Sequence, residues 1–438
     1  MNNNNSLGVR TWRLLPIGLT LCAVNVSAQQ PLDVDTMFSV GAGYSDNIGR
    51  EPVAPVDEVF ARAGMLLDVI EDMPSRQLDI RSNLTYQWYE EAFDSEFVGG
   101  VDAFAEFTLI DERLSWIVEE DYGQVLSDPF LPSRPDNRED VNFFSTGPIV
   151  YFPLGVRTGL EVDLEYSSVR FEEQPSDNDR GQALVSLSRE VRAGRFLSLN
   201  VLGERTEFDD EVMASNNFDR YETFLRFEGE RGQNEFSADI GYTELRLQND
   251  DNSNGLLASF SVGRRLSPLA TLTFAGGSRY SDQGNIFRFM QSLSRVPGQT
   301  NDLNTTATPF RNDFANIIYI ADGERTSIDF RVGWNGEEYE DRTDLDREVV
   351  FVDFYLQRDL TRRIFTNLDL RYTSREFSDL SRSDKDFLSA LLFGYRLNSA
   401  MSVTVQGGRF DRDSNAANAD FTENFVFIGV NYIPRWAR

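Results

Sequence analysis

Carboxylates are the side chains of this sequence that could most readily do chemistry. Asp and Glu number 71 among 438 residues, and glycoside hydrolysis needs only two carboxyl groups flanking one sugar bond. No spacing singles out such a pair, and carboxylates that face water are expected to stay solvated and unreactive. We therefore expect a protein that is not an enzyme and has no catalytic residues.

The residue types that are missing narrow the chemistry further. The chain has no His and only one Cys, Cys22, which excludes Ser-His-Asp catalysis, Cys-His catalysis and imidazole zinc sites. The single Lys, Lys385, lies between Asp384 and Asp386 rather than in a glycine-rich phosphate loop. A net charge of −29 argues against a nucleic acid partner, because phosphate binding requires a basic surface. We expect no cofactor.

The first 28 residues have the pattern of a cleaved signal peptide. Arg10 and Arg13 precede an apolar stretch from Leu14 to Val24, and Val26-Ser27-Ala28 resembles a small-residue cleavage site. A membrane anchor is the alternative, but the uncharged stretch of 15 residues from 14 to 28 is shorter than the roughly 20 that a spanning helix needs. We expect export, with cleavage after Ala28.

The rest of the chain is dominated by a two-residue alternation of side-chain type, which is typical of β-strands with two different faces. Between Gln77 and Tyr89, the mostly apolar face comprises Leu78, Ile80, Ser82, Leu84, Tyr86 and Trp88. The residues between them are polar, apart from the aromatic Tyr89. The same pattern recurs in 156–167, 236–242, 328–334 and 366–372.

The lengths of these strands and of their connections distinguish a membrane barrel from a sandwich. The strands run 10 to 15 residues, where a tilted strand needs about 9 to 11 to cross a bilayer. Short turns alternate with longer loops that are rich in Asp, Glu or Asn. We predict an all-β fold: one closed, antiparallel, up-and-down transmembrane β-barrel of about 20 strands (18–22), from 35–45 to 419–433. Residues 29–438 then form a single domain in a Gram-negative outer membrane, with both termini periplasmic.

Each face of the predicted strands has its own candidate residues. An interfacial aromatic girdle is predicted near the long-loop end of the apolar face. It comprises Trp88, Tyr166, Tyr221, Tyr242, Trp334 and Tyr372. The polar face is predicted to line the lumen. Its candidates are Asp79, Arg81, Asp102, Glu106, Glu161, Asp163, Glu165, Glu222, Arg226, Glu228, Asp239, Asp329, Arg331, Asp369 and Arg371. Acids are in excess, so this lumen is expected to favour cations and to repel a strongly anionic polymer.

Two connections are longer than the others and partly apolar. They span residues 124–140, with three prolines, and 282–312. Long loops on a barrel fold inward and narrow the lumen, or form an ordered external cap, and the sequence leaves both possibilities open.

One loop has part of a calcium-binding pattern. Asp411, Asp413 and Asn415 have the right spacing, but Ala416 replaces the turn glycine and Thr422 replaces the bidentate Glu. We predict no metal site. The acidic loops either stay solvated or hold divalent cations against lipopolysaccharide phosphates.

The chain resembles the family of beta-barrel porins encoded beside exopolysaccharide synthesis and PEP-CTERM/exosortase genes. The resemblance rests on a first strand that runs into Gly43-Tyr44-Ser45-Asp46-Asn47, and on arginine-rich strand ends at 264–268, 358–363 and 396–398. Such barrels usually end on an aromatic residue that the insertion machinery reads. Here six residues follow Tyr432, so Tyr432 or Trp436 takes that place.

The resemblance implies a role in polysaccharide export across the outer membrane. We therefore expect a monomeric conduit for exopolysaccharide, in contact with membrane lipid and lipopolysaccharide and with periplasmic export components. A general or sugar-selective diffusion porin is the first alternative. The second is a closed structural barrel whose acidic loops organise surface polymer.

Overall fold

The computed structural model describes residues 32–211, 213–248, 252–293, 301–304, 308–434 and 436. The predicted signal peptide lies outside this range. The strands are β1 (Asp33–Ser45), β2 (Glu58–Met73), β3 (Arg76–Tyr89), β4 (Glu96–Ile110), β5 (Leu114–Leu126), β6 (Arg138–Pro153), β7 (Thr158–Phe171), β8 (Asn178–Arg192), β9 (Arg195–Phe208), β10 (Phe218–Arg231), β11 (Asn234–Leu247), β12 (Asn252–Ser267), β13 (Ala270–Ser281), β14 (Asn301–Asn304), β15 (Phe310–Asp322), β16 (Thr326–Tyr339), β17 (Arg347–Asp359), β18 (Ile364–Phe377), β19 (Arg382–Arg396), β20 (Met401–Ser414) and β21 (Phe421–Tyr432).

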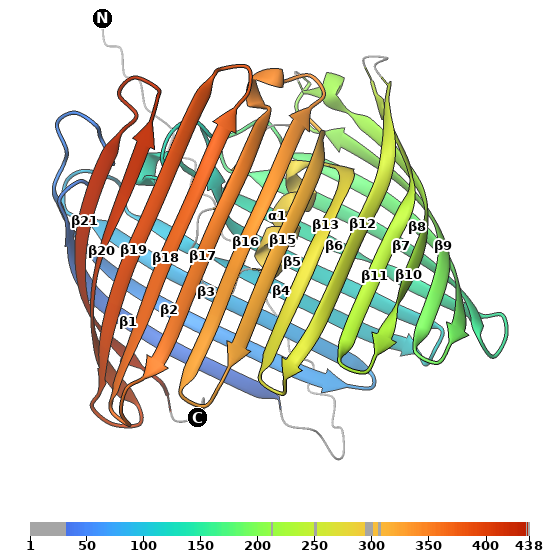
Figure 1. The fold of residues 1–438 in the computed structure, drawn as a ribbon, viewed down its shortest axis with the longest axis horizontal. Helices are drawn as coiled ribbons and strands as arrows, with labels where there is room; N and C mark the ends of the chain where they lie inside the picture. The colour runs from blue at the N-terminus through green and yellow to red at the C-terminus, as the bar shows by residue number, and fades with distance from the viewer. Residues whose placement is uncertain are drawn as a thin grey trace, which may run out of the picture.

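All of these strands except β14 form one closed barrel (Figure 1). Each barrel strand pairs antiparallel with the next, and β13 pairs directly with β15. The ring is closed by β1 and β21, which pair from Phe38↔Tyr432 to Ser45↔Phe425. The short β14 is not a member of this ring of strands, and it pairs in parallel with β5. The prediction of a closed antiparallel barrel of about twenty strands is confirmed.

The two ends of the barrel have different connections. Turns of a few residues join β2 to β3, β8 to β9 and β10 to β11, whereas loops such as 46–57 and 127–137 join strands at the other end. Tyr432 pairs with Met401, the first residue of β20, so the last strand finishes at the short-turn end. The first strand begins there as well, because Phe38 also pairs with Tyr432. This is the end that we expect to face the periplasm.

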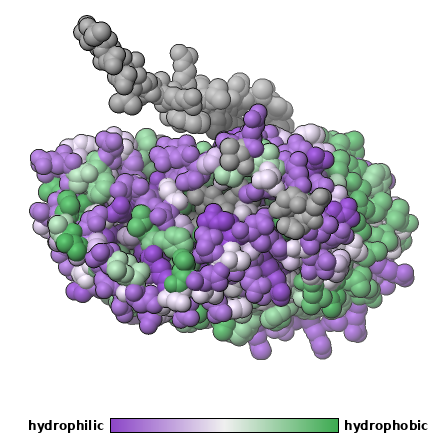
Figure 2. Space-filling model, turned by 90° about the horizontal axis from the view of Figure 1, so that it is seen from above, coloured by the Kyte–Doolittle hydropathy of each residue, from purple (hydrophilic) through white to green (hydrophobic). Residues whose placement is uncertain are grey.

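The alternation of side chains follows from the two environments of the wall. On β3, Trp88 is 45% exposed, while its neighbours Gln87 and Tyr89 are each 3% exposed. Successive residues of a strand point to opposite faces, so Trp88 points outward and the other two point into the barrel. Viewed from above, hydrophilic side chains cover most of the visible end, and hydrophobic ones gather at its outer rim, most densely on one side (Figure 2).

Among the described residues, helical structure is limited to short segments. The longest is α1 (Gln283–Leu293), in the connection between β13 and β15, and three 3-10 turns lie at Pro135–Asn137, Ala214–Asn216 and Thr343–Leu345. Within the described ranges, no helix is both long enough and apolar enough to cross a membrane.

Candidate functional site in the barrel lumen

The structure places all fifteen predicted lumen residues on the inward face of their strands. On β3, Asp79 and Arg81 share the face of the inward-pointing Gln87, and on β10, Glu222 shares the face of Arg220. Three of the fifteen, namely Arg331, Asp369 and Arg371, also line the cavity described below. The other twelve lie elsewhere on the inner wall.

Most of the predicted arginines are held by carboxylates of the same wall. Arg81 Nη2 donates to Asp102 Oδ2 of the neighbouring strand at 2.6 Å. Arg226 makes a bidentate contact with Asp239, at 2.8 Å and 2.9 Å. Ion pairs that remain partly exposed contribute only about 0–1 kcal/mol each, so these pairs fix side-chain positions more than they stabilise the barrel.

The six predicted girdle residues lie on the outer face. Four of them occupy the same position in their strands, eight residues after the first residue of β7, β11, β16 and β18 respectively. These are Tyr166, Tyr242, Trp334 and Tyr372. Tyr221, near the long-loop end of β10, and Trp88 are also exposed.

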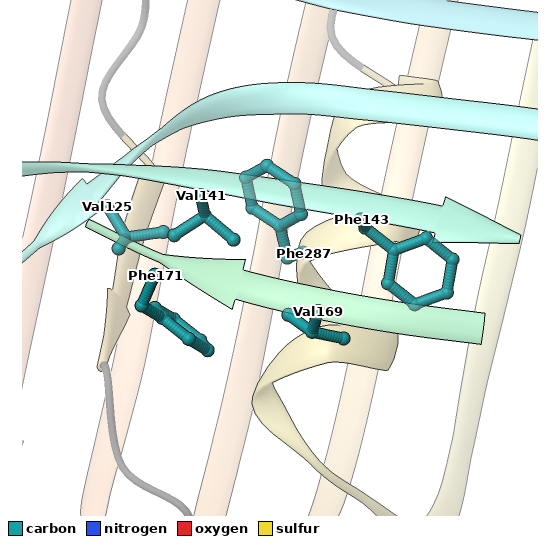
Figure 3. Close-up of a cluster of buried hydrophobic side chains, with 6 residues drawn as sticks. All are labelled: Val125, Val141, Phe143, Val169, Phe171 and Phe287. Carbon is teal, nitrogen blue, oxygen red and sulfur yellow. The ribbon is translucent and has the colours of Figure 1, made fainter. Parts of the chain in front are cut away.

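Helix α1, in the connection between β13 and β15, lies inside the barrel. Phe287 of α1 is 1% exposed and packs against an apolar cluster on the inner face of β5, β6 and β7 (Figure 3). The other members are Val125, Val141, Phe143, Val169 and Phe171. Ile286, the preceding residue, also packs against Phe310 and Tyr339 of β15 and β16. Helix α1 therefore connects two walls of the barrel, so the described helical part of this loop folds inward.

Polar contacts fix the same helix. Asp282, just before α1, forms a buried ion pair with Arg180 of β8 at 2.6 Å. Arg288 pairs with Glu119 of β5 and, at 3.3 Å, with Glu165 of β7. Burial alone would raise the pKa of Asp282, but the nearby guanidinium groups of Arg180 and Arg220 hold that pKa below its usual range. The carboxylate is therefore charged at neutral pH.

The other long connection, residues 127–137, lies across the mouth of the barrel. Asn137 organises it, because its Oδ1 accepts from the Asp128 amide at 2.8 Å and its Nδ2 donates to the Pro132 carbonyl at 3.1 Å. From this loop, Phe130 reaches Phe377 of β18, with ring centroids 5.0 Å apart. Arg134 pairs with Glu51 in the loop between β1 and β2. The loop thus links β5 and β6 to distant parts of the rim.

A cavity of about 920 Å³ remains beside these segments. Its wall includes five carboxylates: Glu337, Asp353, Asp369, Asp386 and Glu423. It also includes ten arginines: Arg50, Arg62, Arg138, Arg220, Arg279, Arg331, Arg347, Arg371, Arg375 and Arg412. Arginines therefore outnumber carboxylates on the wall of this cavity, and the predicted excess of acids is wrong there.

Most of these arginines were not predicted, because several of them lie outside the strands with the clearest alternation. Arg62 and Arg412 lie on β2 and β20, and Arg347 is the first residue of β17. The inward face of β2 mixes charged residues with Phe60, Gly64, Leu66 and Ile70, and its outward face also carries Glu71, so the two faces are not clearly distinguished by polarity. The same two-residue periodicity, applied to β2 and β20 as well, would have placed Arg62 and Arg412 inside.

The calcium-like segment is occupied by protein groups. Arg409 makes a bidentate contact with Asp411, at 2.6 Å and 2.7 Å, and the Thr422 hydroxyl donates to the same carboxylate at 2.7 Å. Across the described ranges, no group of three or more Asp, Glu, His or Cys side chains is arranged to hold a metal ion.

Comparison with known families agrees with this architecture. Residues 349–432 match the family described as "Putative beta-barrel porin 2". The match spans most of β17 and the strands from β18 to β21, and over these residues the resemblance to beta-barrel porins is confirmed. Together with the closed barrel, it places the protein in the outer membrane of a Gram-negative bacterium. No curated protein matches the chain.

Solved structures with similar barrels share little sequence with this chain. The copper transporter OprC is 11% identical, with a TM-score of 0.45 over 93% of this chain and 81% of that protein. The FrpB iron transporter from Neisseria meningitidis is 9% identical, with a TM-score of 0.44 over 91% and 81%. The ferric enterobactin receptor PfeA from Pseudomonas aeruginosa is 8% identical, with a TM-score of 0.46 over 93% and 81%. At these values the likeness says nothing about what this barrel transports.

Proposed function

We propose that this protein is a conduit for the export of an exopolysaccharide across the outer membrane. The observation that carries the proposal is the partly filled lumen, in which a cavity of about 920 Å³ with a charged, polar and aromatic wall remains beside α1. A hydrated polymer needs such a polar path. The resemblance to porins encoded beside exopolysaccharide genes supports the same conclusion.

The narrowing of the lumen favours a dedicated conduit. A barrel of this strand number is wide enough for an aqueous channel, and an unobstructed one would let small solutes leak. Here α1 is fixed to β5–β7 and to β15–β16, and residues 127–137 lie across the mouth. These contacts restrict passage without filling the whole interior.

The test is secretion in the source bacterium. We expect deletion of the gene to remove polymer from the cell surface and the medium and to cause polymer to accumulate in the periplasm. A plasmid copy of the full chain restores secretion, and an empty plasmid is the control. Normal amounts of secreted polymer in the deletion strain would overturn the proposal.

A diffusion porin is the second candidate, because the matching family is described as a porin. Liposomes that contain the folded protein would then swell in isotonic arabinose or raffinose. Swelling together with normal polymer secretion in the deletion strain would favour this function over export.

The proposal includes several points about the surroundings of the barrel. We infer that the barrel works as a monomer among lipids and lipopolysaccharide. It is proposed to contact periplasmic export components at its short-turn end and to catalyse no reaction. Its acidic outer loops are proposed to face lipopolysaccharide.

A further inference from the structure

We propose that Arg62 is the anchor of a binding site for carboxylated sugar units in the lumen. This inference rests on the proposed function, because it names the class of polymer that the conduit would carry. Its starting point is the wall of the cavity, where ten arginines face five carboxylates although the whole chain has a net charge of −29.

Arg62 differs from the neighbouring arginines in its partners. Arg50 pairs with Glu423 at 2.8 Å, and Arg138 pairs with Glu96 at 2.7 Å. Within the described part of the chain, no carboxylate lies within ion-pair distance of Arg62. Its Nε donates to Gln87 Oε1 at 2.7 Å. The terminal nitrogens have no protein acceptor among the described residues, and the residue lines the cavity.

Two aromatic rings support this guanidinium. Its central carbon lies 4.6 Å from the ring centroid of Phe60 and 5.5 Å from that of Phe427. The two rings are nearly parallel, with an angle of 7° and centroids 6.2 Å apart. Cation–π contacts hold an arginine in place without using its hydrogen-bond donors, so the terminal nitrogens stay available to a ligand.

Glycines in β1 make room for both rings. A Cβ on Gly43 would lie 2.5 Å from the Phe60 ring, and a Cβ on Gly41 would lie 2.5 Å from the Phe427 ring. The rings can therefore lie flat against the backbone of the wall. Gly43 is also the first residue of the motif that carries the family resemblance, which ties this motif to the platform under Arg62.

The chemistry of the site fits a sugar carboxylate. A guanidinium binds a carboxylate with two parallel hydrogen bonds. An unpaired guanidinium in a restricted lumen costs desolvation free energy unless an anion compensates its charge. Around Arg62 the cavity is lined by Asn83, Thr85 and Gln87, whose side chains can bind sugar hydroxyl groups. A uronic acid unit presents both a carboxylate and hydroxyl groups.

Equilibrium binding to the detergent-folded full chain tests this site. We expect tetragalacturonate to bind in isothermal titration calorimetry and the neutral maltotetraose to bind at least about tenfold more weakly. The R62Q variant should lose at least about tenfold in affinity for tetragalacturonate and change little for maltotetraose. The matched control is R205Q, because Arg205 lies on the outer face of β9 and is 70% exposed.

Further variants separate the site from a folding defect and from the proposed function. R62K keeps the charge but loses the planar fork of the guanidinium, so we expect its affinity for tetragalacturonate to lie between those of the wild type and R62Q. If heat-modifiable gel mobility shows that R62Q does not fold, R62K replaces it in the comparison. Equal affinity of wild type and R62Q for tetragalacturonate, or equal affinity of the wild type for both oligosaccharides, would overturn the site. Normal secretion in the deletion strain would overturn the conduit even if the Arg62 site binds as expected.

Discussion

The side chain of Asp46 accepts two hydrogen bonds from Asn424, at 2.7 Å from the backbone amide and 2.8 Å from the side-chain amide. The contact joins the end of the first strand to the last strand. Asn47, the next residue, donates from Nδ2 to the Thr422 carbonyl at 3.1 Å and to the Glu51 carbonyl at 2.9 Å. The Asp-Asn pair of the sequence motif thus fastens the β1–β21 seam, where the ring of strands closes.

The first prediction concerns this seam. D46A removes both acceptors and N47A removes the donor, so each should lower the free energy of unfolding by about 1–3 kcal/mol. The measurement is urea unfolding in micelles, followed by heat-modifiable gel mobility. E211A is the control, because Glu211 is exposed in the loop between β9 and β10. Unchanged midpoints for both seam variants would show that strand pairing alone closes the barrel.

The second prediction concerns the position of α1. F287A removes the side chain that fills the cluster on β5–β7, and truncation of a buried Phe typically costs about 3–5 kcal/mol. Because α1 connects two strands that remain paired without it, we expect this cost to release α1 rather than to unfold the barrel. Single-channel conductance should rise severalfold, with strand content by circular dichroism unchanged. L380A, at an exposed turn, should conduct like the wild type.

The third prediction is a pH dependence from Asp282. Its pKa is held below the usual value by Arg180 and Arg220, so its charge stabilises the docked α1 at every pH above the ordinary Asp value of about 3.9. This stabilisation is lost as the pH falls further, through the lowered pKa. Conductance should therefore increase as the pH falls below about 4. In D282N the pH-dependent step should be absent; a step that persists in D282N would assign it to another group.

The fourth prediction compares two adjacent glutamates of β5. Glu119 points into the lumen and pairs with Arg288, so Glu120, one residue later, points outward, opposite Ala103 and Phe144. A lipid-facing acid is unfavourable, and E120L should raise the free energy of unfolding by about 1 kcal/mol. E119L, the matched variant, should loosen α1 and raise conductance. Glu120 has a side-chain hydrogen bond with Asn142 of β6, and a loss of stability in E120L would mean that this hydrogen bond outweighs the cost of an acid facing lipid.

The sequence determined the barrel itself. Lipid outside and water inside impose the same alternation on every strand, and unpaired strand edges are not tolerated in a bilayer. For this reason, the strands around Leu78–Trp88, the short turns and the outward Tyr166 and Trp334 could all be predicted from local spacing. The approximate number of strands followed from counting the turns.

Only the tertiary structure decided what fills and lines the lumen. Periodicity tells whether a side chain points in or out, but not which inward side chains meet, because that depends on how twenty strands close and on where the loops fold. Phe287 and Arg288 find their partners on β5–β7, far away in sequence. Arg62 meets Phe427 only because β1 and β21 are paired. The charge balance of the cavity wall is decided by such long-range contacts, and a count of acids along the strands could not give it.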